Sequence, residues 1–262
     1  MNKKGALFHW MIFGILVAIG LFLVIGQKSV SVGYEVKGTW QLDFLDNYFF
    51  EAEKDLLNID MTAKEIVWES VLSLGKAGGF HKNLPCGQVK LLSVDYAIWN
   101  KGKVWVDCIP KPEESLASRI EEKLKLKLPK QKYSEVKLDK KIVTGKGEPK
   151  SISSTSGKFV NYTYDTSFRI NVGFDVEKDY DELHMDATDL VGNCRGNLKL
   201  QKCIKENKKK TWKFKDCDAE AYTESDNKVV FCAESPQKAK VYKEGKLVPV
   251  RYLLALDFSA VK

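Results

Sequence analysis

Six cysteines are the residues of this chain whose type and spacing most clearly allow chemistry, and that chemistry is disulfide formation. No two of them lie within four residues of each other, so the Cys-x-x-Cys spacing of zinc sites is absent. An even number of cysteines is typical of a protein that folds in an oxidising compartment outside the cytoplasm. The six are Cys86, Cys108, Cys194, Cys203, Cys217 and Cys232.

The local sequence favours one set of cysteine pairs. A polar stretch at residues 223–227 lies between two runs that predict strands. A hairpin centred on this stretch places Cys217 opposite or nearly opposite Cys232, which predicts a bond between them. Cys194 and Cys203 flank a Gly-Asn break and are expected to close a small loop, which leaves Cys86 with Cys108. The alternative is that several of the six are free buried thiols.

Residues that often act in catalysis occur without the motifs that would organise them. The chain has no nucleophile-elbow, phosphate-loop, zinc-protease or calcium-loop motif. His9 lies in an apolar run, and His81 and His184 each stand alone, so we expect structural or surface histidines. The carboxylates Asp179 and Asp181 fall at a predicted helix start, where capping explains them. We therefore predict no catalytic residue, no metal site and no cofactor.

An unbroken apolar run, residues 6–25, follows Lys3 and Lys4. At 1.5 Å per residue the run spans about 30 Å, the thickness of the hydrocarbon core of a bilayer. The positive charge before the run predicts a cytoplasmic N-terminus and a protein held at the cell membrane by a single span. A removable secretory signal is the alternative, although its apolar region is normally only about 7–15 residues long.

The predicted organisation places most of the chain outside the cytoplasm. Asn161 begins an Asn-Tyr-Thr sequence, a glycosylation candidate that has meaning only on an exterior domain. A further division near residue 178 is an open alternative. The expected segments are a cytoplasmic N-terminus (1–5), a transmembrane helix (6–26), a juxtamembrane stalk (27–40) and an extracytoplasmic domain (41–262).

The N-terminal residues Lys3-Lys4-Gly5-Ala6-Leu7, followed by a long apolar segment, resemble the class III signal of archaeal type IV pilin-like proteins. The resemblance covers residues 1–26 only. It implies that a dedicated peptidase cuts between Gly5 and Ala6, and that the apolar helix then packs into a filament core. The chain departs from this family at the fifth residue after Gly5, where Trp10 stands in place of the usual glutamate.

The charged residues argue against nucleic-acid binding. The chain has 262 residues and a formal net charge of +7, but only four of its 42 basic residues are arginine. Arginine is the residue that recognises phosphates and bases through paired hydrogen bonds. The lysine runs Lys123–Lys132 and Lys205–Lys215 are expected to be solvated surfaces, with contact to anionic headgroups or envelope polymers as the alternative.

The hydrophobic periodicity predicts an α+β fold in which helices cover mostly antiparallel strands, behind the single transmembrane helix. Helices are expected over residues 41–74, with a glycine cap at 77–79, over 112–128, and, in one or two pieces, over 179–205. Strands are expected in residues 89–109, with a turn at 100–102, in 133–176, and near 211–222, 228–233, 238–243 and 249–258.

These features predict a membrane-anchored protein of the cell envelope with an extracytoplasmic binding or assembly domain and no catalytic activity. Its expected partner is a protein or an envelope polymer, and the sequence does not indicate an oligomeric state. Two alternatives stay open. One is a pilin-like filament subunit processed after Gly5, and the other is an exterior hydrolase or transferase whose site is assembled from scattered residues.

Overall fold

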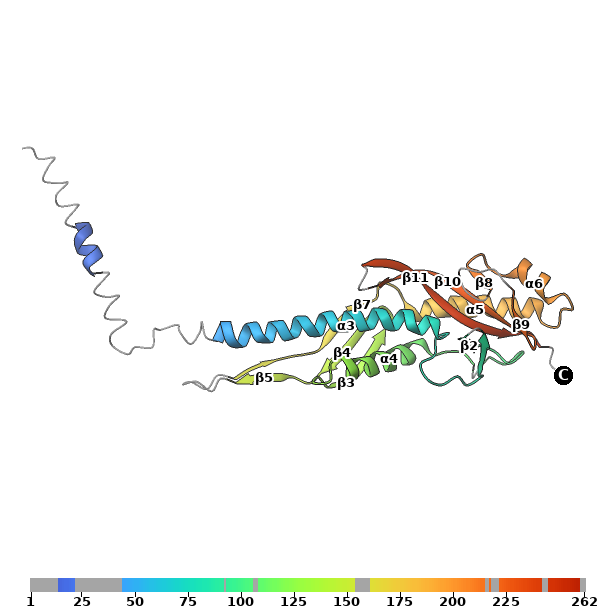
Figure 1. Ribbon diagram of the computed structural model, residues 1–262, viewed down its shortest axis with the longest axis horizontal. Coiled ribbons are helices and arrows are strands. Elements are labelled where there is room, and N and C mark those ends of the chain that lie inside the picture. Colours follow the sequence, from blue (N-terminus) through green and yellow to red (C-terminus); the bar gives the residue numbers. More distant parts are fainter. Residues whose placement is uncertain are drawn as a thin grey trace, which may run out of the picture. The chain divides into compact units, whose positions relative to one another are not determined.

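The computed structural model of the chain is shown in Figure 1. The chain divides into two compact units, Met1–Lys54 with Ser151–Thr163 and Asp55–Lys150 with Tyr164–Lys262. Residue 178 lies inside the second unit. The structure describes residues 14–21, 44–91, 93–105, 108–153, 161–214, 217, 222–241 and 245–259.

The predicted transmembrane helix is wrong for this structure. Among the residues described, no helix is both long and apolar enough to cross a bilayer. Within the apolar run the described helix covers residues 14–21 only, which corresponds to about 12 Å of helix. The rest of the run, the predicted N-terminus at 1–5 and the stalk at 27–40 lie outside the described residues. The fold class is therefore corrected to α+β with mostly antiparallel sheets.

A long helix links the two units. It begins with a π-helical turn, η1 (Leu45–Phe49), and continues as α3 (Phe50–Lys76). In the first unit the ring of Tyr162 on β6 (Asn161–Tyr164) contacts those of Phe44 and Phe49, with centroids 5.6 and 6.1 Å apart. Strand β6 pairs with β5 (Lys150–Ser153) in a two-stranded sheet.

The C-terminal half of α3 packs into the second unit. Its buried residues follow the predicted three-and-four spacing and include Ile59, Ala63, Ile66, Val67, Val71 and Leu74. The predicted glycine cap is present, because Gly78 and Gly79 have φ angles of +63° and +88° and Gly79 N donates to Leu74 O. At Gly75 an added Cβ would lie 2.6 Å from Arg251 O, so the helix and strand β11 approach closely.

A six-stranded sheet forms the centre of the second unit. Its order is β1-β2-β11-β10-β8, with β9 paired to β10, and only the β2–β11 pair is parallel. The ladder of β10 and β11 is irregular between Glu234 and Lys238, where Pro236 lacks a backbone donor. The strands are β1 (Gln88–Leu91), β2 (Val94–Ile98), β8 (Trp212–Phe214), β9 (Glu224–Ser225), β10 (Lys228–Val241) and β11 (Lys246–Asp257).

A second, three-stranded antiparallel sheet has the order β3 (Tyr133–Asp139), β4 (Ile142–Gly147) and β7 (Phe168–Asn171). Helix α4 (Pro112–Lys127) matches the predicted helix and packs against β3. Its buried residues Leu116, Ile120 and Leu124 recur every four positions, as a helix with one buried face requires.

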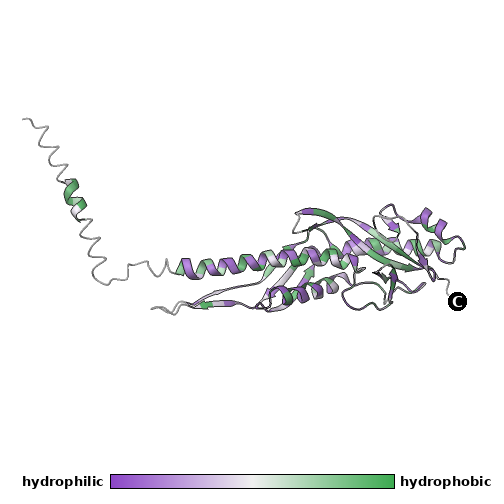
Figure 2. Cartoon of the chain, viewed as in Figure 1, coloured by the Kyte–Doolittle hydropathy of each residue, from purple (hydrophilic) through white to green (hydrophobic). Residues whose placement is uncertain are grey.

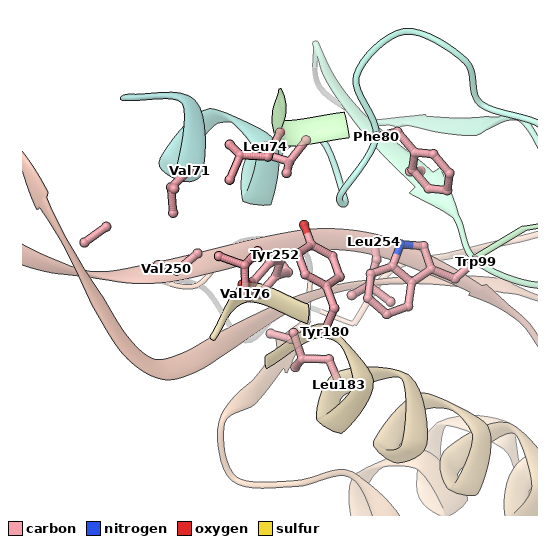
Figure 3. Close-up of a cluster of buried hydrophobic side chains, with 14 of the residues drawn as sticks. Val71, Leu74, Phe80, Trp99, Val176, Tyr180, Leu183, Val250, Tyr252 and Leu254 are labelled. Atoms are coloured by element: carbon pink, nitrogen blue, oxygen red, sulfur yellow. The ribbon is translucent and has the colours of Figure 1, made fainter. Parts of the chain in front are cut away.

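The predicted helix at residues 179–205 is broken into α5 (Val176–Cys194) and α6 (Leu200–Asn207). Helix α5 contacts both β10 and β11. Figure 3 shows part of the core that results, in which side chains from α3, α5 and β11 face one another and Trp99 lies beside Tyr180 and Leu254. The members labelled there include Tyr180 and Leu183 of α5, Val71 and Leu74 of α3, and Val250, Tyr252 and Leu254 of β11.

One predicted hairpin is wrong. Residues 103–109 were expected to form a strand after a turn at 100–102, but the residues described there, 103–105 and 108–109, take part only in an isolated bridge between Lys101 and Val104. The hairpin turn lies earlier, between β1 and β2, where Ser93 has a φ of +70°. Asn100 is instead buried, and its side chain bonds to the backbone of Asp257 at 2.7 and 2.8 Å.

Candidate binding site

A groove of about 660 Å³ lies between the α5–α6 loop and the turn that precedes β10. One wall consists of residues 196–202. The other wall consists of Tyr222, Glu224, Asn227 and Phe258. The groove is called the α6 groove below. It joins segments that are at least twenty residues apart in the sequence.

The first wall is a loop closed by a disulfide. Helix α5 ends at Cys194, and the bond Cys194–Cys203 ties that end to α6. Gly196 turns the chain with a φ of +68°, a conformation that favours glycine. Asn197 Oδ1 then accepts a hydrogen bond of 2.8 Å from Lys199 N. Leu198, between these residues, is fully exposed.

The second wall is formed by an aromatic side chain and a tight turn. The Tyr222 hydroxyl donates to Glu224 Oε2 at 2.6 Å, and its ring packs edge-on against Phe214. Burial, followed by the Glu224 carboxylate, raises the pKa of Tyr222, so its hydroxyl stays protonated at neutral pH. Asn227 has a φ of +61° in the turn, and its carbonyl accepts from Phe258 N at 2.9 Å.

The lining of the α6 groove combines a few charged side chains with apolar ones. Its charged side chains are Lys199, Lys202 and Glu224. The described residues that line the groove include no histidine, cysteine, serine or threonine. A nucleophile with an adjacent base is therefore missing from the described walls. Glu224, the one carboxylate among the described lining residues, already accepts a hydrogen bond from the Tyr222 hydroxyl.

The three disulfides join the pairs that the sequence favoured, Cys86–Cys108, Cys194–Cys203 and Cys217–Cys232. No cysteine in the described part of the chain is free. The reason proposed for the third pair is wrong, however. Cys232 lies opposite Lys213 of β8, and Ser225 of β9 lies opposite Lys228. Cys217 sits in a turn outside this ladder and reaches Cys232 from there.

A buried carboxylate was missed by the sequence analysis. Asp179 is only 5% exposed, and it accepts hydrogen bonds from the Ser235 hydroxyl at 2.6 Å and the Tyr252 hydroxyl at 2.5 Å. Its expected role as a helix cap is wrong, because Asp175 is the N-cap and accepts from Lys178 N. The missed signal was its position on the buried face of α5, three residues after Val176 and four before Leu183.

Asp179 also lines a polar depression of about 390 Å³, together with Asp175, Glu182 and Gln237. Each of its two oxygens already accepts a hydroxyl hydrogen, which leaves neither one unpartnered to act as a base. Burial raises the pKa of Asp179, while the two hydroxyl bonds lower it. We interpret this carboxylate as a link between α5 and the central sheet.

Replacing Asp179 with asparagine is expected to reduce the pH dependence of stability. Because the folded-state pKa is raised, folding favours the protonated carboxyl, and the free energy of unfolding falls as pH rises through that pKa. Asparagine does not titrate, so this fall should be smaller in the variant. Urea titrations between pH 4 and 8 measure it, with Asp181→Asn as an exposed control on the same helix. An unchanged profile in Asp179→Asn would contradict the assignment.

The two described histidines do not meet and neither lines the α6 groove. His81 Nε2 lies 3.0 Å from Glu122 Oε2, and burial, with the nearby Arg119, lowers its pKa. The His184 ring packs edge-on against Trp105, and burial lowers its pKa too. Within the described residues no cluster of three or more His, Cys, Asp or Glu side chains is positioned to hold a metal.

The remaining candidate residues concern modification and processing. Asn161 is exposed at the start of β6, where its Oδ1 accepts a bond of 3.3 Å from the Ser153 hydroxyl. Glycosylation there stays a prediction. Gly5 and Ala6, the expected processing site, lie outside the described residues, so cleavage between them also stays a prediction.

No family model, no curated protein and no solved structure matches this chain. Its function is therefore inferred from its own residues and geometry.

Proposed function

We propose that this chain is an extracytoplasmic binding protein, stabilised by disulfides, whose partner defines its role. The observation that carries the proposal is that a disulfide closes the first wall of the α6 groove and that another disulfide begins five residues before Tyr222 of the second wall. Cys194–Cys203 closes the loop of the first wall. Cys217–Cys232 ties Cys217 to β10. A preformed groove loses less conformational freedom on binding than a flexible one.

The pairing of the cysteines also supports a place outside the cytoplasm, since disulfides persist in oxidising compartments and are rare in reducing ones. Binding is favoured over a hydrolase or transferase by the lining of the groove, which offers lysines, one engaged carboxylate and apolar side chains. A binding site needs only such complementary surface, whereas acyl or glycosyl transfer needs a nucleophile or paired carboxylates.

The redox state of the cysteines in the producing cells tests this proposal. Cells are treated with a high-mass maleimide before and after reduction, and the protein is resolved by electrophoresis. We expect no mass increase without the reductant and six additions with it. Protease added to intact cells should also digest the domain. Cysteines that all react without reduction, in protein that resists digestion, would refute the proposed compartment and with it the proposed function.

A further inference from the structure

We propose that the α6 groove binds an acidic segment of a partner protein, with an apolar side chain of that segment packed against Leu198, Leu200 and Tyr222. The inference rests on the proposed binding function and names the chemistry of the partner. It follows from three features of the groove, which are its charge, the availability of its lysines and its exposed apolar residues.

The first wall of the groove belongs to a strongly basic segment of the chain. Residues 195–213 contain eight of the 42 basic residues and one of the 35 acidic residues, so this segment has a formal charge of +7. That equals the net charge of the whole chain, and the other residues balance at 34 of each sign. Helix α6, inside this segment, is mostly hydrophilic in Figure 2. The segment that leads into the second wall, residues 214–227, has one basic and five acidic residues, so an acidic partner would be drawn to the first wall.

The lysines that line the groove are available to a partner. Lys202 Nζ is 3.8 Å from Glu206 Oε1, and both side chains are well exposed. Such exposed pairs are weak and exchange readily for a new carboxylate. Lys199 makes no ion pair with any residue that the structure describes. Glu224, the one acidic residue among the described lining, lies on the second wall, where it accepts a hydrogen bond from the Tyr222 hydroxyl.

The apolar residues of the groove distinguish a protein segment from a polyanion. Leu198 is fully exposed at the rim, and Leu200 and Tyr222 are partly exposed within it. The disulfide Cys194–Cys203 holds Leu198 in this position. A polysaccharide or nucleic acid would use the lysines and leave the leucine in water. An acidic segment with one large apolar side chain would bury Leu198, as the anchors of protein interfaces do.

The experiment measures fluorescence anisotropy of a labelled nonapeptide that has one central phenylalanine between two blocks of acidic residues. The full oxidised chain should bind it saturably, and less tightly as salt is added. Leu198→Ser and Lys202→Glu should each weaken binding by about tenfold. A peptide with serine at its centre should show the same loss with the unmodified protein.

Matched controls separate the groove from general surface effects. Lys111→Glu is matched to Lys202→Glu. The Lys111 side chain is 76% exposed and its Nζ lies 3.5 Å from a glutamate oxygen, and the corresponding values for Lys202 are 71% and 3.8 Å. Leu126→Ser changes a leucine that is 76% exposed on α4. Both controls should bind the peptide within about twofold of the unmodified chain. Circular dichroism checks that every variant is folded.

Three outcomes would overturn the proposal. They are no saturable binding of the peptide, an equal loss of affinity in the control variants, or an affinity that is unchanged in Leu198→Ser. In the last case a sulfated polysaccharide that competes fully would show that the face binds polyanions. These failures differ from failure of the proposed function. If the cysteines are oxidised in cells but the chain does not bind the peptide, only the proposed chemistry of the partner is refuted.

Discussion

Replacing Trp99 with alanine is expected to lower the free energy of unfolding by about 3–5 kcal/mol. Trp99 is completely buried, its ring stacks on Tyr180, and its Nε1 donates to Gly78 O at 2.9 Å. It thus joins the end of α3 to α5 and the central sheet (Figure 3). Single domains are stable by only about 5–15 kcal/mol, so the loss is a large share of the total.

Urea unfolding followed by circular dichroism, without reductant, measures this effect. Trp99→Phe is the matched variant, because it keeps an aromatic ring and removes the hydrogen bond to Gly78. Its free energy of unfolding should fall less than that of the alanine variant. The phenylalanine ring fills most of the space that alanine leaves empty, so the loss of the hydrogen bond is the main remaining cost. A loss below about 1 kcal/mol in Trp99→Ala would show that Trp99 does not hold these elements together.

Removing the disulfide Cys194–Cys203, by changing both residues to alanine, is expected to lower the free energy of unfolding by about 2–3 kcal/mol. The bond spans nine residues, and a closed loop restricts the unfolded chain. The same change also releases the first wall of the α6 groove. Amide hydrogen exchange of residues 196–202 should therefore accelerate.

The matched control is the double alanine variant of Cys86 and Cys108, whose bond spans 22 residues and lies away from the groove lining. It should lose at least as much stability, since the loop is longer. It should leave exchange at residues 196–202 unchanged under native conditions. Equal exchange in the two variants would mean that the disulfide does not shape the groove.

Features that depend on local sequence were predictable. Pro112 and the four-residue spacing of Leu116, Ile120 and Leu124 define α4 almost to the residue. Gly78 and Gly79 mark the end of α3 through their φ angles. The α+β class and the mostly antiparallel sheets follow from the same kind of pattern.

Features that depend on distant segments were not predictable. The parallel pairing of Ala97 with Leu254 joins strands from opposite parts of the chain, and no local pattern indicates it. Hydropathy placed the apolar run at residues 6–25 in a membrane, but no described helix is long and apolar enough to span one. The α6 groove arises because Gly196 and Phe258 meet through a backbone hydrogen bond, which periodicity alone does not reveal.

The proposed binding of a protein partner through the α6 groove can be tested in cells. The most direct test replaces Leu198 with a photoreactive phenylalanine analogue in the producing cells, with the same replacement at Leu126 as control. We predict a light-dependent protein adduct at position 198 only, with mass spectrometry placing the cross-link in an acidic segment of the partner. Equal adducts at both positions, or no adduct at position 198, would contradict the proposed binding of a partner at the α6 groove.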